Sequence, residues 1–142
     1  RERAAKCRNM RANGLDPIEE KRAGAAERKA AAAREQTFRQ CANAYIAAHR
    51  AGWKNAKHAD QWAATLETYA HPVIGDILVS RVDTALVLRV LEPIWTARTE
   101  TATRLRGRIE SVLDWARVRG HRTGDNPARW RGHLDHMLPK RS

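Results

Sequence analysis

The chain has 142 residues, with 27 Lys and Arg against 16 Asp and Glu, so its net charge is +11 at neutral pH. This length suits one compact domain with an extension, and no apolar run approaches the roughly 20 residues that a membrane span needs. The charge predicts attraction to nucleic acid, to an anionic membrane or to an acidic protein, and by itself it does not choose among them.

Residues 1–36 are rich in Ala, Arg, Lys and Glu and contain no aromatic residue. Gly14 favours the end of a first helix, and Asp16 with Pro17 favours the start of a second. Such a segment forms helices readily but has little to bury. We therefore expect a helical connector, and the opening RERAAKCRNM, without an initial Met, suggests a piece of something longer.

The two cysteines, Cys7 and Cys41, are few for a chain of this size. Cys41 lies in an apolar helical pattern, and no secretory signal opens the sequence. We therefore expect two free thiols in a reducing compartment, such as the cytoplasm, rather than a disulfide.

The predicted core begins at Thr37, a suitable helix N-cap that precedes apolar residues spaced by three and four as far as His49. Gly52 favours the end of this helix. A second helix is predicted from about Lys54 to Tyr69, with an inner face of Ala59, Trp62, Leu66 and Tyr69. A basic flank lies beside that face: Lys54, Lys57, His58 and Gln61.

The next stretch, HPVIGDILVSRV, interrupts the helical spacing and is expected to close one end of a bundle. Asp83 and Thr84 favour the start of a third helix, in which Pro93 predicts a bend or a break near Leu91. A fourth helix is predicted from about Thr99 to Arg119, before Gly120. The spacing predicts an all-α bundle of four main helices.

The fourth helix carries its charges on both sides of an apolar stripe. At about 100° per residue, the stripe contains residues that lie within roughly 80° of Leu105. Its members are Ala102, Leu105, Ile109, Val112, Leu113 and Ala116. On one flank, Arg106 has Glu110 four residues later as a partner, whereas on the other neither Arg104 nor Arg108 has an acid four residues after it. Exposed arginines are common on helices, but these two also suit a helix that enters a DNA groove.

Residues for catalysis or metal binding are poorly represented. His133 and His136 have no cysteine or acid at a familiar zinc spacing, and no GxxxxGK[ST] loop occurs. Both tyrosines, Tyr45 and Tyr69, lie in apolar helical patterns, which favours structural roles. We expect no catalytic residue, cofactor or metal in this chain.

Four stretches occur in a recognisable order: TFRQCANAYIAAHRAGWKNAKHADQW, TLETYAHPVIGDILVSRVDTALVLRVLEPIW, TATRLRGRIESVLDWARVRG and NPARWRGHLDHMLP. Together, from about Thr37 to Pro139, they resemble the core-binding region of phage-type integrases, which are tyrosine site-specific recombinases. The resemblance implies a SAM-like, four-helix core-binding domain at residues 37–132. It also implies that residues 1–36 are a remnant of an arm-binding domain with its linker, and that residues 133–142 lead toward a missing catalytic domain.

The resemblance further implies a DNA-binding fragment that does not cut DNA. The family's tyrosine nucleophile lies much farther toward the C-terminus than Tyr45 or Tyr69, and its His-x-x-Arg motif does not occur here. The implied partners are the double-stranded core of an attachment site, the protein's own catalytic domain and a higher-order assembly on DNA, with no membrane. The expected DNA contacts are Lys54, Lys57, His58, Gln61, Thr101, Thr103, Arg104, Arg106 and Arg108.

Two alternatives remain open from the sequence. A basic helical bundle also suits a non-enzymatic module that binds an acidic protein, or a stand-alone DNA-binding regulator. Binding to duplex DNA separates the first alternative from an integrase fragment. The parent reading frame separates the second, because an integrase encodes a catalytic domain after Ser142.

Overall fold

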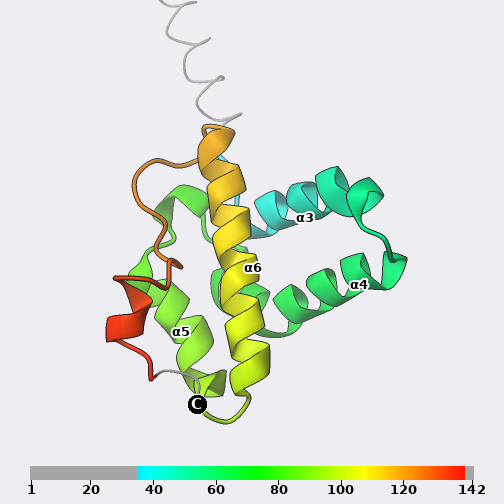
Figure 1. Ribbon diagram of the computed structural model, residues 1–142. Coiled ribbons are helices and arrows are strands. Elements are labelled where there is room, and N and C mark those ends of the chain that lie inside the picture. The colour runs from blue at the N-terminus through cyan, green and yellow to red at the C-terminus, as the bar shows by residue number, and fades with distance from the viewer. Residues whose placement is uncertain (1–34, 140–142) are drawn as a thin grey trace, which may run out of the picture. The chain divides into compact units, whose positions relative to one another are not determined.

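The computed structural model describes residues 35–139, and this part of the chain is all-α (Figure 1). It contains four α-helices: α3 (Phe38–His49), α4 (Ala56–Thr65), α5 (Thr84–Trp95) and α6 (Thr99–Val118). Three further helical segments lie between them, η1 (Arg50–Gly52), η2 (Leu66–Gly75) and η3 (Val79–Arg81), and a fourth, η4 (Leu134–His136), follows α6. The predicted fold class is confirmed. The helices predicted before residue 35, and Cys7, lie outside the described residues.

Helix α6 is the central element of the fold, with α3 and α5 packed against it (Figure 1). All six residues of its predicted apolar stripe are buried. The same core takes in Phe38, Ile46 and Leu91 from the neighbouring helices. The 100° periodicity of α6 therefore identified the side that the bundle covers.

Two predicted N-caps are present in the structure. The Thr37 hydroxyl accepts from the backbone N–H of Gln40, and the Gln40 side chain accepts from the backbone N–H of Thr37, which is a complete capping box. Asp83 caps α5 by accepting from the backbone N–H of Leu86 at 3.0 Å. Each cap satisfies a backbone donor that the first turn of a helix leaves without a partner.

The second predicted helix continues beyond its expected end. After Thr65 the backbone widens into the π-helical segment η2, which runs through Pro72 to Gly75. At Gly75 a Cβ atom would lie 2.9 Å from both the Cβ of His71 and Nη2 of Arg39, so a larger residue does not fit without movement. This segment brings Ile74 into the core, as expected for a stretch that closes the bundle.

Helix α5 does not break where Pro93 predicted an interruption. It runs without a gap from Thr84 to Trp95, with Pro93 two residues before its last residue. A proline removes one backbone hydrogen bond toward the preceding turn. Near a helix end that loss is confined to the final turn, so the predicted break and restart near Leu91 does not occur.

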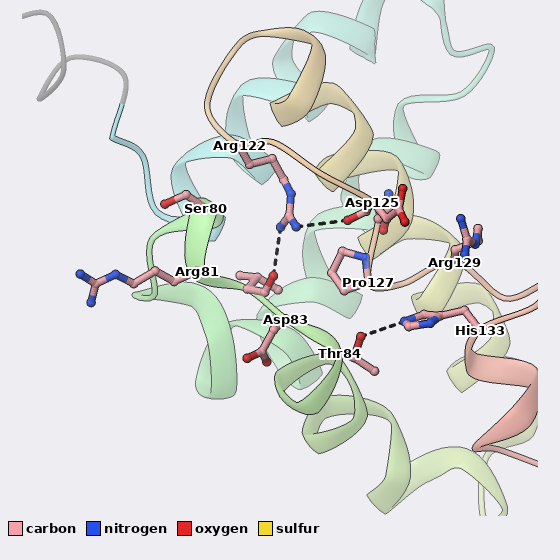
Figure 2. Close-up of a pocket in the computed structure, with 11 residues that line it drawn as sticks. Ser80, Arg81, Asp83, Thr84, Arg122, Asp125, Pro127, Arg129 and His133 are labelled. Atoms are coloured by element: carbon pink, nitrogen blue, oxygen red, sulfur yellow. Dashed lines mark hydrogen bonds between the residues drawn. The ribbon is translucent and has the colours of Figure 1, made fainter.

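The segment after α6 folds back over the bundle and contributes to its core. Leu134 is fully buried, Leu138 is buried, and the Trp130 ring stacks on Trp95 with the centroids 5.3 Å apart. Thr84 and His133 share a hydrogen bond of 2.8 Å between Oγ1 and Nε2 (Figure 2). Residues 133–139 thus belong to the same packed structure as the helices.

Arg122 fixes the start of this returning segment. Its Nη1 donates to the carbonyl oxygens of Val79 at 2.9 Å and Val82 at 3.1 Å. Figure 2 shows its guanidinium pointing into a pocket of about 340 Å³, whereas Arg81 points away from that pocket. Burial lowers the pKa of Arg122 from its ordinary value. Within the described residues, no helix is both long and apolar enough to cross a membrane.

Candidate nucleic-acid interface

The start of α4 presents an exposed basic surface, which we call the α4 surface: Lys54, Lys57, His58 and Gln61. Asn55 begins the helix by accepting from the backbone N–H of Lys57 at 2.9 Å. Neither lysine forms an ion pair within residues 35–139. Their charges therefore lie at a helix N-terminus, where the partial positive charge of the backbone also favours anions.

A stack of rings supports the α4 surface from behind. Trp53 stacks on Trp62 with the centroids 5.5 Å apart, and Trp62 stacks on Tyr45 at 4.9 Å. His58 meets the edge of Trp53 at 4.8 Å, and His49 stacks on Tyr45 at 4.1 Å. These contacts join α3 to α4, so the α4 surface stands on a packed hairpin. The charge pattern alone gave no indication of this support.

The first turns of α6 carry a second set of predicted contacts. Arg104 is exposed and has no ion pair in the described part of the chain. Thr101 is half-buried, and the Thr103 hydroxyl donates to the carbonyl oxygen of Thr99 at 2.7 Å. Of these three, Arg104 has the side chain best placed to meet a partner in solvent.

Arg106 is committed to contacts within the domain. Its Nη1 donates to Glu110 Oε1 at 2.8 Å and to the carbonyl oxygen of Ala128 at 2.7 Å. The first bond is the ion pair that the sequence predicted. The second attaches α6 to the returning segment and leaves only 16% of the Arg106 side chain exposed.

Arg108 is buried, contrary to the expectation of a charge that faces solvent on an open flank. Only 6% of the residue is exposed. Its Nη1 donates to Thr65 Oγ1 at 2.6 Å and to the carbonyl oxygen of Gln61 at 3.1 Å, and its guanidinium carbon lies 5.5 Å from the centre of the Trp62 ring. Burial, together with the charge of Arg104, lowers its pKa from the ordinary value. Arg108 thus connects α6 to α4.

The predicted contacts therefore include two exposed groups, the α4 surface and Arg104, and one buried bridge, Arg108. The α4 surface lies on the hairpin of α3 and α4, which projects to one side of α6, and Arg104 lies in the first half of α6 (Figure 1). Arg108 lies four residues after Arg104 and contacts the helix that carries the other group. The structure brings Gln61 and Arg108 together directly, through the backbone of Gln61.

Comparison with known proteins identifies the family of this chain. A family model described as the phage integrase central domain matches residues 38–133. The chain belongs to the phage integrase central-domain family. The predicted resemblance to phage-type integrases is thereby confirmed, and the match covers all four helices of the described structure.

Two individual proteins are similar to this central domain. Prophage integrase IntZ of Escherichia coli (strain K12) is 30% identical over 118 residues, which make up 82% of this chain and 28% of that protein. The solution NMR structure of a protein from Nitrosospira multiformis is 65% identical, with a TM-score of 0.66, and the match covers 71% of this chain and 95% of that one. The matched part of this chain thus spans about 28% of the length of the E. coli integrase.

Proposed function

We propose that this phage integrase central domain binds duplex DNA at the core of an attachment site, as one part of site-specific recombination. The observation that carries the proposal is a set of exposed cations without ion pairs among the described residues: Lys54, Lys57 and Arg104. They lie at the start of α4 and on α6, in a chain with a net charge of +11. Phosphate contacts of this kind supply most of the affinity that proteins have for DNA irrespective of sequence.

The two groups have different proposed roles. Lys54 and Lys57 suit phosphates, because an ammonium on a flexible stem is a point charge that carries little sequence information. Arg104 and the Gln61 side chain are able to form paired hydrogen bonds with guanine and adenine edges, respectively. His58 and Thr101 are proposed as auxiliary contacts beside them. Affinity would then come mainly from the α4 surface and selectivity from Arg104 and Gln61.

Arg106, Arg108 and Thr103 have smaller direct roles in this proposal than their residue types suggest. Their polar atoms already bond to Ala128 and Glu110, to Gln61 and Thr65, and to Thr99, respectively. Breaking a buried hydrogen bond in order to form one with DNA gives little net free energy.

The central domain is proposed to bind DNA, and bond breakage is assigned to a catalytic domain elsewhere in the full-length integrase. The tyrosines of the chain suit structural positions, since Tyr45 lies between His49 and Trp62 in the ring stack. The proposed partners are attachment-site DNA, the catalytic domain and further integrase copies on DNA. The proposed location is the bacterial cytoplasm.

A salt titration of DNA binding tests the proposal. If the chain neutralises about 6 phosphates, the slope of log K against log salt concentration is near −5. Lys54→Ala combined with Lys57→Ala should make this slope shallower by about 2. Arg117→Ala removes one exposed charge from the distant half of α6 and is the control, with a smaller effect expected.

Selectivity is tested with an attachment-site duplex and a scrambled duplex of equal length. Arg104→Ala should reduce the difference in affinity between them by roughly 1–3 kcal/mol if Arg104 reads a base. Failure to bind duplex DNA even at low salt would refute the proposal and favour an acidic protein as the partner. Equal small effects of Arg104→Ala and Arg117→Ala would favour a diffuse solvated charge.

A further inference from the structure

Helix α4 is held to α6 by a side chain rather than by close backbone packing. The backbone of α4 packs mainly on α3 and η2, whereas α6 packs mainly on α3 and α5. Figure 1 shows α4 extending to one side of α6, below α3 in this view. In the described part of the chain, the hydrogen bonds from α6 to α4 both start at Nη1 of Arg108.

The contacts of Arg108 define both the position and the direction of α4. Thr65 and Gln61 are four residues apart, and the Thr65 hydroxyl donates to the Gln61 carbonyl oxygen at 2.6 Å while it accepts from Arg108. The guanidinium also lies over Trp62, between these two residues in sequence. One planar group thus contacts a full turn of α4 at a backbone oxygen, a hydroxyl and a ring face.

Burying this charge is costly, because Arg108 has no carboxylate partner within residues 35–139. An apolar residue at this position would avoid the desolvation of a guanidinium but would provide no hydrogen bonds to α4. Because both bonds start at one nitrogen, a lysine ammonium has enough donors for the same two acceptors, but it is shorter and lacks the planar guanidinium that lies over the Trp62 ring. The side chain at position 108 is thus well suited to fixing geometry rather than to adding stability.

We propose that Arg108 is a positioning residue that sets the orientation of α4 relative to α6, so that the α4 surface and Arg104 contact the same DNA duplex. The inference rests on the proposed DNA-binding function. Arg108 acts through Thr65 and the Gln61 backbone and need not touch DNA. Loosening the bridge leaves every exposed cation present but places the two groups at variable distances from each other.

The test uses the full chain and compares Arg108→Lys, Thr65→Val and the double variant with the wild type. Affinity for a fluorescent attachment-site duplex is measured by anisotropy over a salt series, and amide NMR spectra are recorded without DNA. Each single variant should weaken binding at least about threefold, and the double variant should be no weaker than the poorer single variant, because both changes break one bridge. The salt slope should stay unchanged, and amide shifts should appear at Lys54, Lys57 and His58.

Arg104→Ala is the matched control on the same helix. As a direct contact, it should make the salt slope shallower by about 1 and should leave the amides of the α4 surface in place. Thr65→Val keeps the size of the side chain and all charges, so it decides the question if Arg108→Lys fails to fold, as judged by circular dichroism.

Each remaining outcome overturns the inference. Wild-type affinity in a folded Thr65→Val variant means that the bridge does not set the binding geometry. In Arg108→Gln, which removes the charge, a shallower salt slope combined with no effect of Thr65→Val means that Arg108 contacts phosphate directly. If the wild type itself does not bind DNA, the proposed function fails, and this inference fails with it. If the wild type binds DNA and the folded Thr65→Val variant binds equally well, only this inference fails.

Discussion

The indole Nε1 of Trp95 donates a hydrogen bond of 2.6 Å to the carbonyl oxygen of Pro139. This bond joins the end of α5 to the last residue that the structure describes, 44 positions later in the sequence. The Trp95 ring also stacks on Trp130, so one side chain holds the returning segment at two places.

Replacing Trp95 with Phe should lower the free energy of unfolding by about 1–3 kcal/mol. The change removes the indole donor and part of a buried aromatic contact while keeping an aromatic ring. Chemical denaturation followed by circular dichroism measures the loss. Trp115→Phe is the control, because Trp115 is only half-buried, and it should cost less. Equal losses would show that the bond to Pro139 contributes little.

Arg106→Ala should destabilise the domain by about 1–3 kcal/mol, because the partly buried carbonyl oxygen of Ala128 loses its donor. Glu110→Gln removes the charge of the other partner and should cost less than about 1 kcal/mol, as for a partly exposed ion pair. Urea unfolding of both variants measures the difference. If Arg106→Ala instead left stability unchanged and weakened DNA binding, Arg106 would have a direct role on DNA.

Acid should destabilise the domain through His71. The residue is only 5% exposed, and burial lowers its pKa below the ordinary 6.5, an effect that Arg39 increases and that Glu67 and Asp76 oppose. Below about pH 6.5 the unfolded chain gains a proton at His71 that the folded chain does not bind. Stability contributed by this residue is thus full above 6.5 and falls until the pH reaches the lowered folded pKa.

Denaturant titrations between pH 7.5 and pH 5 measure this dependence. In His71→Gln, which does not titrate in this range, the decline of the unfolding free energy toward low pH should be smaller than in the wild type. An identical decline in both proteins would show that other groups cause the acid sensitivity.

Cys41 should be unreactive in the folded protein. Its residue is fully buried, and burial raises the pKa of its thiol to about 11, so very little reactive thiolate exists at neutral pH. In a Cys7→Ser variant, a thiol reagent should therefore label the protein only as fast as it unfolds. Labelling in native buffer at the rate seen in denaturant would contradict this expectation.

Much of the fold followed from local patterns. The Thr37 and Asp83 caps, the ends of α6 and its six-residue apolar stripe all depend on residues close in sequence, and all are present in the structure. The π-helical segment η2 was not predictable, because its period departs from 3.6 residues per turn and it continues through Pro72. The position of Pro93 in the last turn of α5 explains why that helix is not interrupted.

Arg108 illustrates what the sequence could not supply. Three residues after Leu105, it lies about 60° from Leu105 around the helix, an angle at which burial is geometrically possible. Its charge favoured exposure, because buried arginines are rare without partners. The partners are a hydroxyl and a backbone oxygen on another helix. They become evident only when the packing of α4 is known, and Arg122 after Gly120 is a second case of the same kind.

The anchoring of Gln36 and Pro139, near the two ends of the described part of the chain, makes α6 a spacer of fixed length. Gln36 accepts from the backbone N–H of Val79, which Arg122 ties to the C-terminal end of α6. Pro139 is bound to Trp95, whose carbonyl oxygen accepts from Thr99 at the first turn of α6. The 20 residues of α6 span about 30 Å. A pulling force applied between Gln36 and Pro139 would therefore act across the two ends of α6. The main-chain hydrogen bonds of this helix would resist its extension.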